Sequence, residues 1–314
     1  MSPHPPPRPV YVAPAGEGRL VPKGWLDDAP VTRMLLALNV AVFLVETAIT
    51  HMAMDLPTRP ALQLGAIYSP ATVGELRLET LVTACFLHAG VLHIGFNMLA
   101  LWQGGPLVER AVGSARMAPM YLLAGVFGNV LSVGVGWLTR SAELSLGASG
   151  AISGVLAAAL VIGWRAQGWR GPLTQAMLRW LGFIVVFGLL SSLTGGHIDN
   201  AAHLGGALAG ALIATRWRRG FRYSDGGTRG IVAACAAVVV ASIAVVGVRD
   251  KTDRFAAMTL QDRAAFTNDA LAYARCRDAR EGVLAVERLL PRADHRAIFL
   301  QRRVTSECGG RAVY

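Results

Sequence analysis

Long apolar runs alternate with short polar gaps along most of this chain of 314 residues. Each run is close to the length that an α-helix needs to cross about 30 Å of hydrocarbon at about 1.5 Å per residue. The pattern predicts seven membrane-spanning helices. Their approximate bounds are residues 32–50, 89–106, 118–138, 147–164, 177–195, 200–215 and 230–248.

The composition agrees with a membrane protein. Hydrophobic residues make up 53% of the chain and charged residues only 16%, which is too apolar for a soluble domain with a wetted surface. The formal net charge of +10 does not indicate nucleic acid binding, because no pattern of interleaved basic and aromatic residues accompanies it. We therefore predict an all-α fold, a polytopic helical bundle in the membrane.

The basic residues lie mainly in the gaps and predict the orientation of the bundle. If the N-terminus is cytosolic, most arginines fall in cytosolic gaps, and the gap between the fifth and sixth spans has no Lys or Arg. The positive-inside rule then predicts the N-terminus inside and the C-terminus outside. The cytosolic arginines are Arg110, Arg116, Arg165, Arg170, Arg216, Arg218, Arg219, Arg222 and Arg229, against Arg59, Arg77 and Arg140 on the outer side.

Two flanking segments lack the pattern of a span. Residues 1–30 are rich in proline and predict a flexible cytosolic arm, and no cleavable signal peptide is evident before the first span. Residues 249–314 alternate charged and apolar positions, which predicts a small tail of two short amphipathic helices on the outer side. Cys276 and Cys308 in this tail are expected to form a disulfide if that side is oxidising, whereas Cys85 and Cys235 are expected to be buried thiols.

Polar side chains inside apolar spans are costly, so they indicate functional positions. In the second span, His93 and Asn97 are four residues apart and share one helix face, where both offer hydrogen-bond donors to the same point. The alternative is that the two side chains merely tie helices together. The span alone does not decide between these interpretations.

Serines occupy every fourth position at the start of the fourth span, so spacing alone does not select one of them. They are Ser141, Ser145, Ser149 and Ser153. A serine hydrogen-bonded to its own helix backbone is the common alternative to a functional one. Gly147 and Gly150 distinguish Ser149, because they leave its hydroxyl and backbone open to a close approach.

The sixth span carries His203 one turn before Gly206. Gly206 and Gly210 form a small-residue face, so His203 is expected to point toward a closely packed neighbour. A lone membrane histidine is often structural or part of a proton path. However, His93, Ser149 and His203 all fall near the outer ends of spans that run from outside to inside. Three helices would thus bring a serine, a histidine and further donors to one depth, and acyl transfer requires such groups.

Three short motifs occur in order along the chain. They are His93-x-x-x-Asn97, Gly147-x-Ser149-Gly150 and Ala202-His203-x-x-Gly206, and His88 lies five residues before the first. They resemble the signature motifs of the rhomboid family of intramembrane serine proteases. The resemblance covers about residues 32–215. It implies a six-helix protease core over residues 31–217, with the span at residues 230–248 added as a seventh helix.

The resemblance implies that Ser149 attacks a peptide bond of a membrane protein substrate and that His203 accepts the proton of the serine hydroxyl. The two residues would form a catalytic dyad, without the acidic third residue of a triad. Asp199, four residues before His203, is expected to cap the helix instead. The oxyanion would be held by the side chains of His93 and Asn97 and by the backbone N–H of Ser149. No metal or organic cofactor is implied. The residues expected to support the cavity are His88, Gly147, Gly150 and Gly206.

The family also implies a polar cavity that opens to the outer side and substrates that reach it sideways by a shift of the fifth span. Four large apolar side chains of that span are expected to provide no polar lock. They are Leu178, Phe183, Val186 and Phe187. The chain departs from the family in the first outer loop, where a Trp-Arg pair is usual and where Leu76-Arg77 lies three residues too early. This leaves open how the loop is anchored.

Two other functions fit parts of the pattern. A catalytically inactive rhomboid-like protein that binds or escorts membrane proteins would share the fold, but such relatives usually lose the serine or the histidine. A proton-coupled transporter would use His93, His203 and Glu46, yet no inverted repeat is visible, and Glu46 is more simply a snorkelling or hydrogen-bonded carboxylate. The arginine usage favours a bacterial cytoplasmic membrane, with the mitochondrial inner membrane as the alternative. The oligomeric state is left open.

Overall fold

The structure is a computed structural model that describes residues 24–51, 56, 58–74, 76–139, 144–193, 198–218 and 227–252. The predicted N-terminal arm up to residue 23 lies outside the described residues, as does the predicted tail beyond residue 252 with Cys276 and Cys308.

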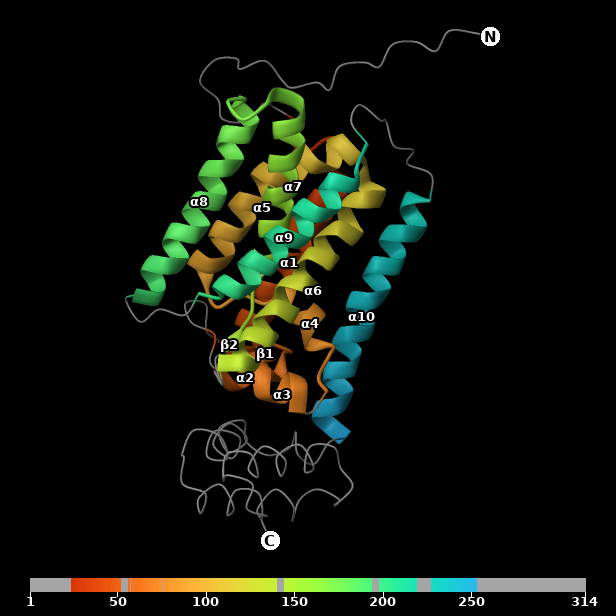
Figure 1. The fold of residues 1–314 in the computed structure, drawn as a ribbon. Coiled ribbons are helices and arrows are strands. Elements are labelled where there is room, and N and C mark those ends of the chain that lie inside the picture. Colours follow the sequence, from red (N-terminus) through yellow and green to blue (C-terminus); the bar gives the residue numbers. More distant parts are fainter. Residues whose placement is uncertain are drawn as a thin grey trace.

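The described chain folds as an all-α bundle, as the sequence predicts (Figure 1). The long helices are α1 (Pro30–Thr50), α5 (Val91–Val112), α6 (Ser114–Thr139), α7 (Ser149–Gln167), α8 (Pro172–Leu193), α9 (Asn200–Arg216) and α10 (Thr228–Thr252). The connection from α1 to α5 holds α2 (Thr58–Gln63), β1 (Ile67–Tyr68), α3 (Ser69–Gly74), α4 (Thr80–Thr83) and a 3-10 turn (Ala84–Phe86). Strand β1 pairs antiparallel with β2 (Leu144–Ser145), which precedes α7.

Five of the described helices are long and apolar enough to cross a membrane, namely α1, α6, α7, α8 and α10. A sixth span is counted if the segment from Thr80 to Phe86 and α5, which meet at a bend of 91°, form one unit. The seven predicted spans correspond to the seven long helices, of which these five or six are long and apolar enough to cross a membrane. Helix α9 is left out because it has only 17 residues. It lies against α6 and α7, so its neighbours rather than lipid cover much of its surface.

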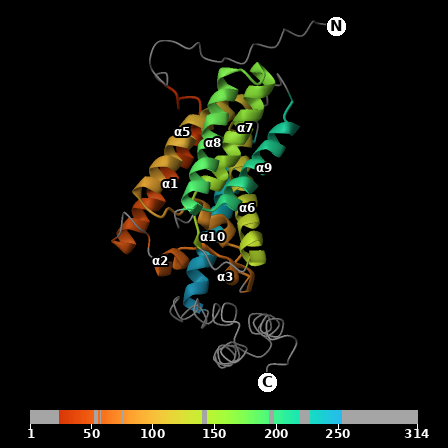
Figure 2. The same cartoon turned by 60° about the vertical axis from the view of Figure 1, so that its left-hand side comes forward.

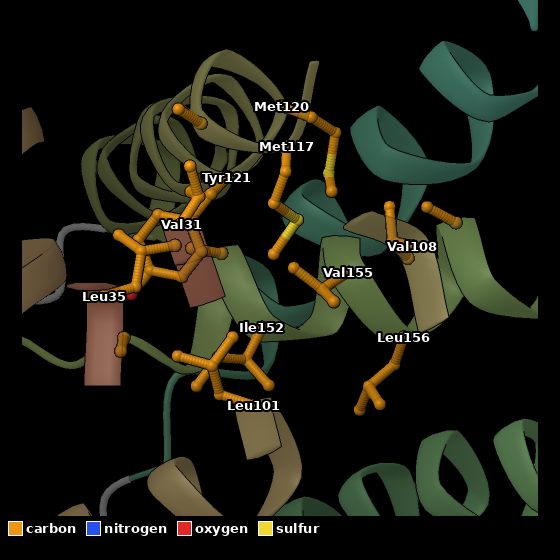
Figure 3. Packing of buried hydrophobic residues seen from close by; sticks show 14 of the residues in the cluster. Val31, Leu35, Leu101, Val108, Met117, Met120, Tyr121, Ile152, Val155 and Leu156 are labelled. Atoms are coloured by element: carbon orange, nitrogen blue, oxygen red, sulfur yellow. The ribbon is translucent and has the colours of Figure 1, made fainter. Parts of the chain in front are cut away.

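Helix α7 is the central helix of the bundle. In its most apolar stretch of 18 residues 61% are buried, against 28% or less in the other four candidate spans. Helices α5, α6, α8 and α9 pack around α7, while α1 and α10 lie outside α5 and α6 (Figures 1 and 2). The buried cluster between these helices includes Val31, Leu35, Leu101, Val108, Met117, Met120, Tyr121, Ile152, Val155 and Leu156 (Figure 3).

The outward faces of the helices are apolar. Large aliphatic side chains on six different helices are more than half exposed, among them Leu44, Leu92, Leu138, Leu193, Leu208 and Val240. A water-soluble monomer rarely exposes so much apolar surface, whereas lipid covers it without cost. Together with the apolar spans, this surface identifies the chain as a multi-pass integral membrane protein.

Helices α7 and α9 cross with almost no side chain between their backbones. A Cβ atom built on Gly206 would lie 1.9 Å from the carbonyl oxygen of Gly150, and one built on Gly210 would lie 2.0 Å from that of Gly154. The predicted small-residue face of Gly206 and Gly210 is therefore confirmed. Because the two backbones touch, this crossing sets the separation between the start of α7 and the start of α9.

A buried carboxylate from α5 caps the first helix. Glu109 accepts hydrogen bonds from the backbone N–H of Val31 at 2.8 Å and from the backbone N–H of Thr32 at 2.8 Å. The hydroxyl groups of Thr32 and Ser114 donate to the same carboxylate at 2.7 and 2.6 Å. The first N–H groups of a helix have no acceptor within the helix, and negative charge is favoured there. Glu109 therefore joins the start of α1 to α5 and α6.

Replacing Glu109 by alanine is expected to lower the free energy of unfolding by about 3 kcal/mol, because buried donors on α1 lose their acceptor. The unfolding temperature of the purified protein in detergent measures this effect. Glu109→Gln keeps an accepting oxygen and should lose less stability. Equal stability of Glu109→Ala and the wild type would contradict the cap.

The C-terminal end of α10 is attached to the loop between α1 and α5. Arg249 donates to the carbonyl oxygen of Leu76 at 3.0 Å and pairs with Glu79 at 3.2 Å. The guanidinium Nε of Arg77, a residue that is only 3% exposed, lies 3.5 Å from the same carboxylate. The loop that lacks the Trp-Arg pair is thus held by charged groups, one of them contributed by α10.

Candidate active site

Three polar residues lie at the starts of central helices, at the end of the bundle that carries β1, β2 and the short helices α2 to α4 (Figure 1). Ser149 is the first residue of α7, and His93 and His203 lie in the first turns of α5 and α9. The pairing of β1 with β2 joins the loop between α1 and α5 to the segment that precedes Ser149, with Ile67 opposite Ser145. The helix starts and this short ladder thereby hold the three side chains in one region.

The hydroxyl of Ser149 and the imidazole of His203 are in hydrogen-bond contact. The distance from Ser149 Oγ to His203 Nε2 is 2.8 Å. If the proton of the neutral ring is on Nδ1, Nε2 accepts the hydrogen bond of the hydroxyl and is able to take its proton. Nδ1 is buried and has no hydrogen-bond partner among the described residues. No carboxylate in the described part of the chain orients this ring.

Asp199 caps α9, and this prediction is confirmed. Its Oδ1 accepts a hydrogen bond from the backbone N–H of Ala202 at 2.8 Å, the geometry of a helix N-cap. Its Oδ2 accepts from the hydroxyl groups of Ser132 and Ser145. The carboxylate therefore links the start of α9 to α6 and to β2, and it makes no hydrogen bond to His203.

The imidazole of His93 presents its Nε2 toward the segment that precedes Ser149. The backbone N–H of Ala89 donates to His93 Nδ1 at 3.3 Å, so Nδ1 carries the lone pair and the neutral ring carries its proton on Nε2. A Cβ atom built on Gly147 would lie 2.9 Å from His93 Nε2 and 3.6 Å from Ser149 Oγ. An N–H donor and the serine oxygen thus approach the same small volume from different helices.

The open space at Gly147 is needed for this approach. Its φ of +135° is one that residues with side chains rarely adopt, and an added Cβ would come within 2.8 Å of His93 Cε1. Gly147→Ala is therefore expected to displace His93 and to slow the reaction of Ser149 with a fluorophosphonate probe by about 100-fold, the size of effect that follows loss of one oxyanion donor.

Gly168→Ala is the matched control for this prediction. Gly168 also has a positive φ, +74°, but nothing lies within 4 Å of a Cβ atom built there. The two variants share backbone strain and differ in the contact with His93. Equal labelling rates for both variants would mean that strain, and not displacement of His93, slows the reaction.

Asn97 and His88 lie on either side of His93. One amide hydrogen of Asn97 is used in a bond to the carbonyl oxygen of His93 at 2.9 Å, and the amide has a second hydrogen for another acceptor. Asn97 is 5% exposed and His88 is 1% exposed. The ring of His88 meets the ring of His93 edge to face, with centroids 5.3 Å apart. Of the predicted supporting glycines, Gly147 borders His93.

Helix α8, the predicted fifth span, makes its polar contacts through residues other than the large apolar ones. Phe183, Val186 and Phe187 are indeed apolar and about half exposed. However, Trp180 donates to Gln103 of α5 at 3.2 Å, and Asn200 donates to Ser192 of α8 at 3.2 Å. Sequence reasoning missed these anchors because it considered only the outward face. Phe183 also contacts Phe96 of α5, with ring centroids 6.2 Å apart.

Sequence reasoning also left the setting of Glu46 undecided. Glu46 is 2% exposed, and its Oε2 accepts from the backbone N–H of His88 at 3.2 Å. This geometry is that of a hydrogen-bonded carboxylate and not of a snorkelling one. The sequence feature that could have indicated this buried setting was the position of a carboxylate inside an apolar span.

No cluster of three or more His, Cys, Asp or Glu side chains with the arrangement of a metal site occurs in the parts of the chain that the structure describes. The described cysteines are Cys85, which is buried, and Cys235, which is half-buried, and both are free thiols.

Fold and site together define a polytopic membrane protein with the kind of serine–histidine contact that serine hydrolases use. Residues 75–219 match the family model described as the rhomboid domain. This segment contains His93, Asn97, Ser149 and His203, whereas α1 and α10 lie outside it. Residues 75–219 therefore form a rhomboid domain, and the chain is similar to members of the rhomboid family.

Curated relatives come from bacteria, plants and fungi. The chain is 36% identical over 138 residues to Rhomboid protease GluP of Bacillus subtilis, covering 43% of this chain and 25% of that protein. It is 34% identical over 154 residues to RHOMBOID-like protein 1 of Arabidopsis thaliana, covering 48% and 37%. It is 37% identical over 131 residues to Rhomboid-type serine protease 2 of Emericella nidulans, covering 41% and 24%.

Two of these relatives are named as proteases, and one of the two as a serine protease. The matches span between 24% and 37% of the length of the three relatives.

Proposed function

We propose that this protein is an intramembrane serine endopeptidase that hydrolyses peptide bonds in or next to transmembrane helices of other membrane proteins. The observation that carries the proposal is the 2.8 Å contact between Ser149 Oγ and His203 Nε2. The two residues come from different helices and are 54 positions apart in the chain. A serine that only satisfied its own helix backbone would need no such partner.

In the proposed reaction, His203 Nε2 takes the proton of Ser149 as Oγ attacks the carbonyl carbon of the substrate. The tetrahedral intermediate collapses when Nε2 gives this proton to the leaving amine, which leaves an acyl group on Oγ. Water then attacks the acyl carbon while Nε2 accepts a proton from it. Return of that proton to Oγ releases the carboxylic acid product and restores the serine.

Three donors are suited to hold the oxyanion of the intermediate. The backbone N–H of Ser149 is among the first of α7, where N–H groups have no acceptor within the helix and the helix dipole favours negative charge. His93 carries its proton on the nitrogen that faces Gly147. Asn97 has a second amide hydrogen. Such donors act most strongly where water is scarce.

The surroundings of the site support a membrane protein as substrate. The contact between Phe96 and Phe183 is apolar and lies between α5 and α8, so a shift of α8 would open a path from lipid once its polar anchors are released. Substrate helices with small or helix-breaking residues near this end are preferred, because a helix must unwind to present its carbonyl group. The arginine distribution supports an orientation with the site near the outer face, the N-terminus in the cytosol and the C-terminus outside. The preference for arginine over lysine favours a bacterial cytoplasmic membrane.

The test is cleavage of a tagged single-span substrate, with Gly and Pro near the outer end of its helix, by the purified protein in proteoliposomes. Two fragments are expected with the wild type and none with Ser149→Ala of equal thermal stability. Equal cleavage by both proteins would remove Ser149 as nucleophile. If the wild type cleaves no substrate of a panel and a fluorophosphonate does not label it, the inactive binding or escort protein becomes the better explanation.

A further inference from the structure

We propose that Glu46 is a positioning residue that acts through the backbone of residues 84–90 to hold His93 as an oxyanion donor. This inference rests on the proposed function. Glu46 lies on α1, outside the residues that match the rhomboid domain, and it is not among the groups that the proposed reaction uses.

The carboxylate of Glu46 is buried and has a specific partner. Glu46 is 2% exposed, and its Oε2 accepts a hydrogen bond from the backbone N–H of His88, 42 residues away in the chain, at 3.2 Å. Its other oxygen, Oε1, is buried without a hydrogen-bond partner among the described residues. Burial of a half-satisfied carboxyl group costs free energy. A position selected only for stability would carry an apolar residue of similar size.

The turn that Glu46 contacts is held at several points. The backbone N–H of Gly147 donates to the carbonyl oxygen of Ala84 at 2.8 Å, and the N–H of Leu56 donates to that of Ala89 at 2.8 Å. Within the turn, the ring of His88 is hydrogen-bonded through Nδ1 to the carbonyl oxygen of Phe86 at 3.2 Å. Glu46 supplies the contact to α1 between these points.

The same turn determines which nitrogen of His93 carries the proton. Ala89, whose N–H donates to His93 Nδ1 at 3.3 Å, directly follows His88, whose N–H donates to Glu46. A rotation of the peptide groups at residues 88 and 89 would break this bond and release the ring. The edge-to-face contact between His88 and His93 connects the same two elements through their side chains. The path from Glu46 to the Nε2 proton of His93 therefore runs through two adjacent peptide groups.

The proposal predicts opposite effects on activity and on stability. Glu46→Met removes the acceptor while filling the volume, so the unfolding temperature should stay the same or rise, since a buried carboxyl group is lost. The kcat for the single-span substrate should fall by about 10- to 100-fold through misplacement of His93, with KM changed by less than about twofold. Glu46→Gln keeps an accepting oxygen and should retain kcat within about threefold of the wild type.

A double-mutant cycle decides whether Glu46 acts through His93. His93→Ala removes the donor, so Glu46→Met added to it should cause no further loss of kcat. Asn39→Leu is the matched control on α1. Asn39 lies two helical turns before Glu46, is fully buried and bonds to Leu35 and Tyr121, so kcat should not change. An unchanged kcat in Glu46→Met, or an equal further loss in the His93→Ala background, would overturn the proposal.

The rate of fluorophosphonate labelling of Ser149 is the second readout, because the adduct also places an oxygen at the oxyanion position. If the wild type is labelled but cleaves no substrate, the proposed protease function fails while the cycle is still measured by labelling. If the wild type cleaves and the cycle shows no coupling, only the role of Glu46 fails. If the wild type neither cleaves nor reacts, both proposals fall.

Discussion

A His203→Ala variant is expected to cleave the single-span substrate at least about 10⁴-fold more slowly than the wild type, with its fold intact. Loss of the imidazole removes the group that takes the proton of Ser149 and later protonates the leaving amine. The contact at 2.8 Å is the only hydrogen bond to the side chain of His203 within the described residues, so its loss should cost little stability. Initial cleavage rates in proteoliposomes and unfolding temperatures in detergent measure the two effects.

Asp199→Asn is the control that separates a dyad from a triad. Asparagine caps helices about as well as aspartate, and the carboxylate of Asp199 bonds to Ala202, Ser132 and Ser145. Cleavage within about tenfold of the wild type is therefore expected, whereas loss of the acidic member of a triad lowers kcat by about 10⁴-fold. A loss of that size in Asp199→Asn would show that the carboxylate serves the imidazole directly.

Gly206→Ala is expected to destabilise the protein by at least about 3 kcal/mol and to abolish cleavage. The new Cβ would lie 1.9 Å from the carbonyl oxygen of Gly150 and 3.2 Å from its Cα. Both are backbone atoms of α7, so no side chain is able to move aside. The helices would have to separate, and because Ser149 and His203 lie at their starts, the hydrogen bond between them would lengthen as well.

Gly134→Ala is the matched control for this prediction. Gly134 lies on α6, and nothing is within 4 Å of a Cβ atom built there. Alanine in the middle of a helix is favoured over glycine by about 0.5 to 1 kcal/mol, so this variant should be as stable as the wild type or more so. If Gly206→Ala unfolds at the same temperature as Gly134→Ala, the backbone contact between α7 and α9 is not as tight as the structure has it.

The sequence predicted the fold class and the gathering of the polar residues because both depend on local spacing. Apolar runs of membrane length locate the helices, and the glycines around Ser149 and after His203 mark where backbones approach closely. The N-cap role of Asp199 was likewise predictable, since it depends only on the position of an aspartate before a helix. The roles of Ser149, His203, His93 and Asn97 remain proposals that these contacts support.

The remaining features depend on contacts between distant parts of the chain. Nothing local indicates that Glu109 caps α1, that Arg249 reaches Glu79, or that Glu46 meets His88. The predicted second span ended too early, because α5 continues through Pro106 to Val112. These features are determined by packing between distant parts of the chain, which the local sequence pattern does not contain.

The crossing of α7 and α9 also limits how this chain can evolve. In an ordinary core, a neighbour that becomes smaller often compensates for an enlarged residue. At Gly206 and Gly210 the opposing groups are the backbones at Gly150 and Gly154, and no amino acid is smaller than glycine. A substitution at Gly206 or Gly210 therefore has no compensating partner across the contact. Functional variants selected from random libraries should keep glycine at these two positions even when the surrounding apolar residues are exchanged freely.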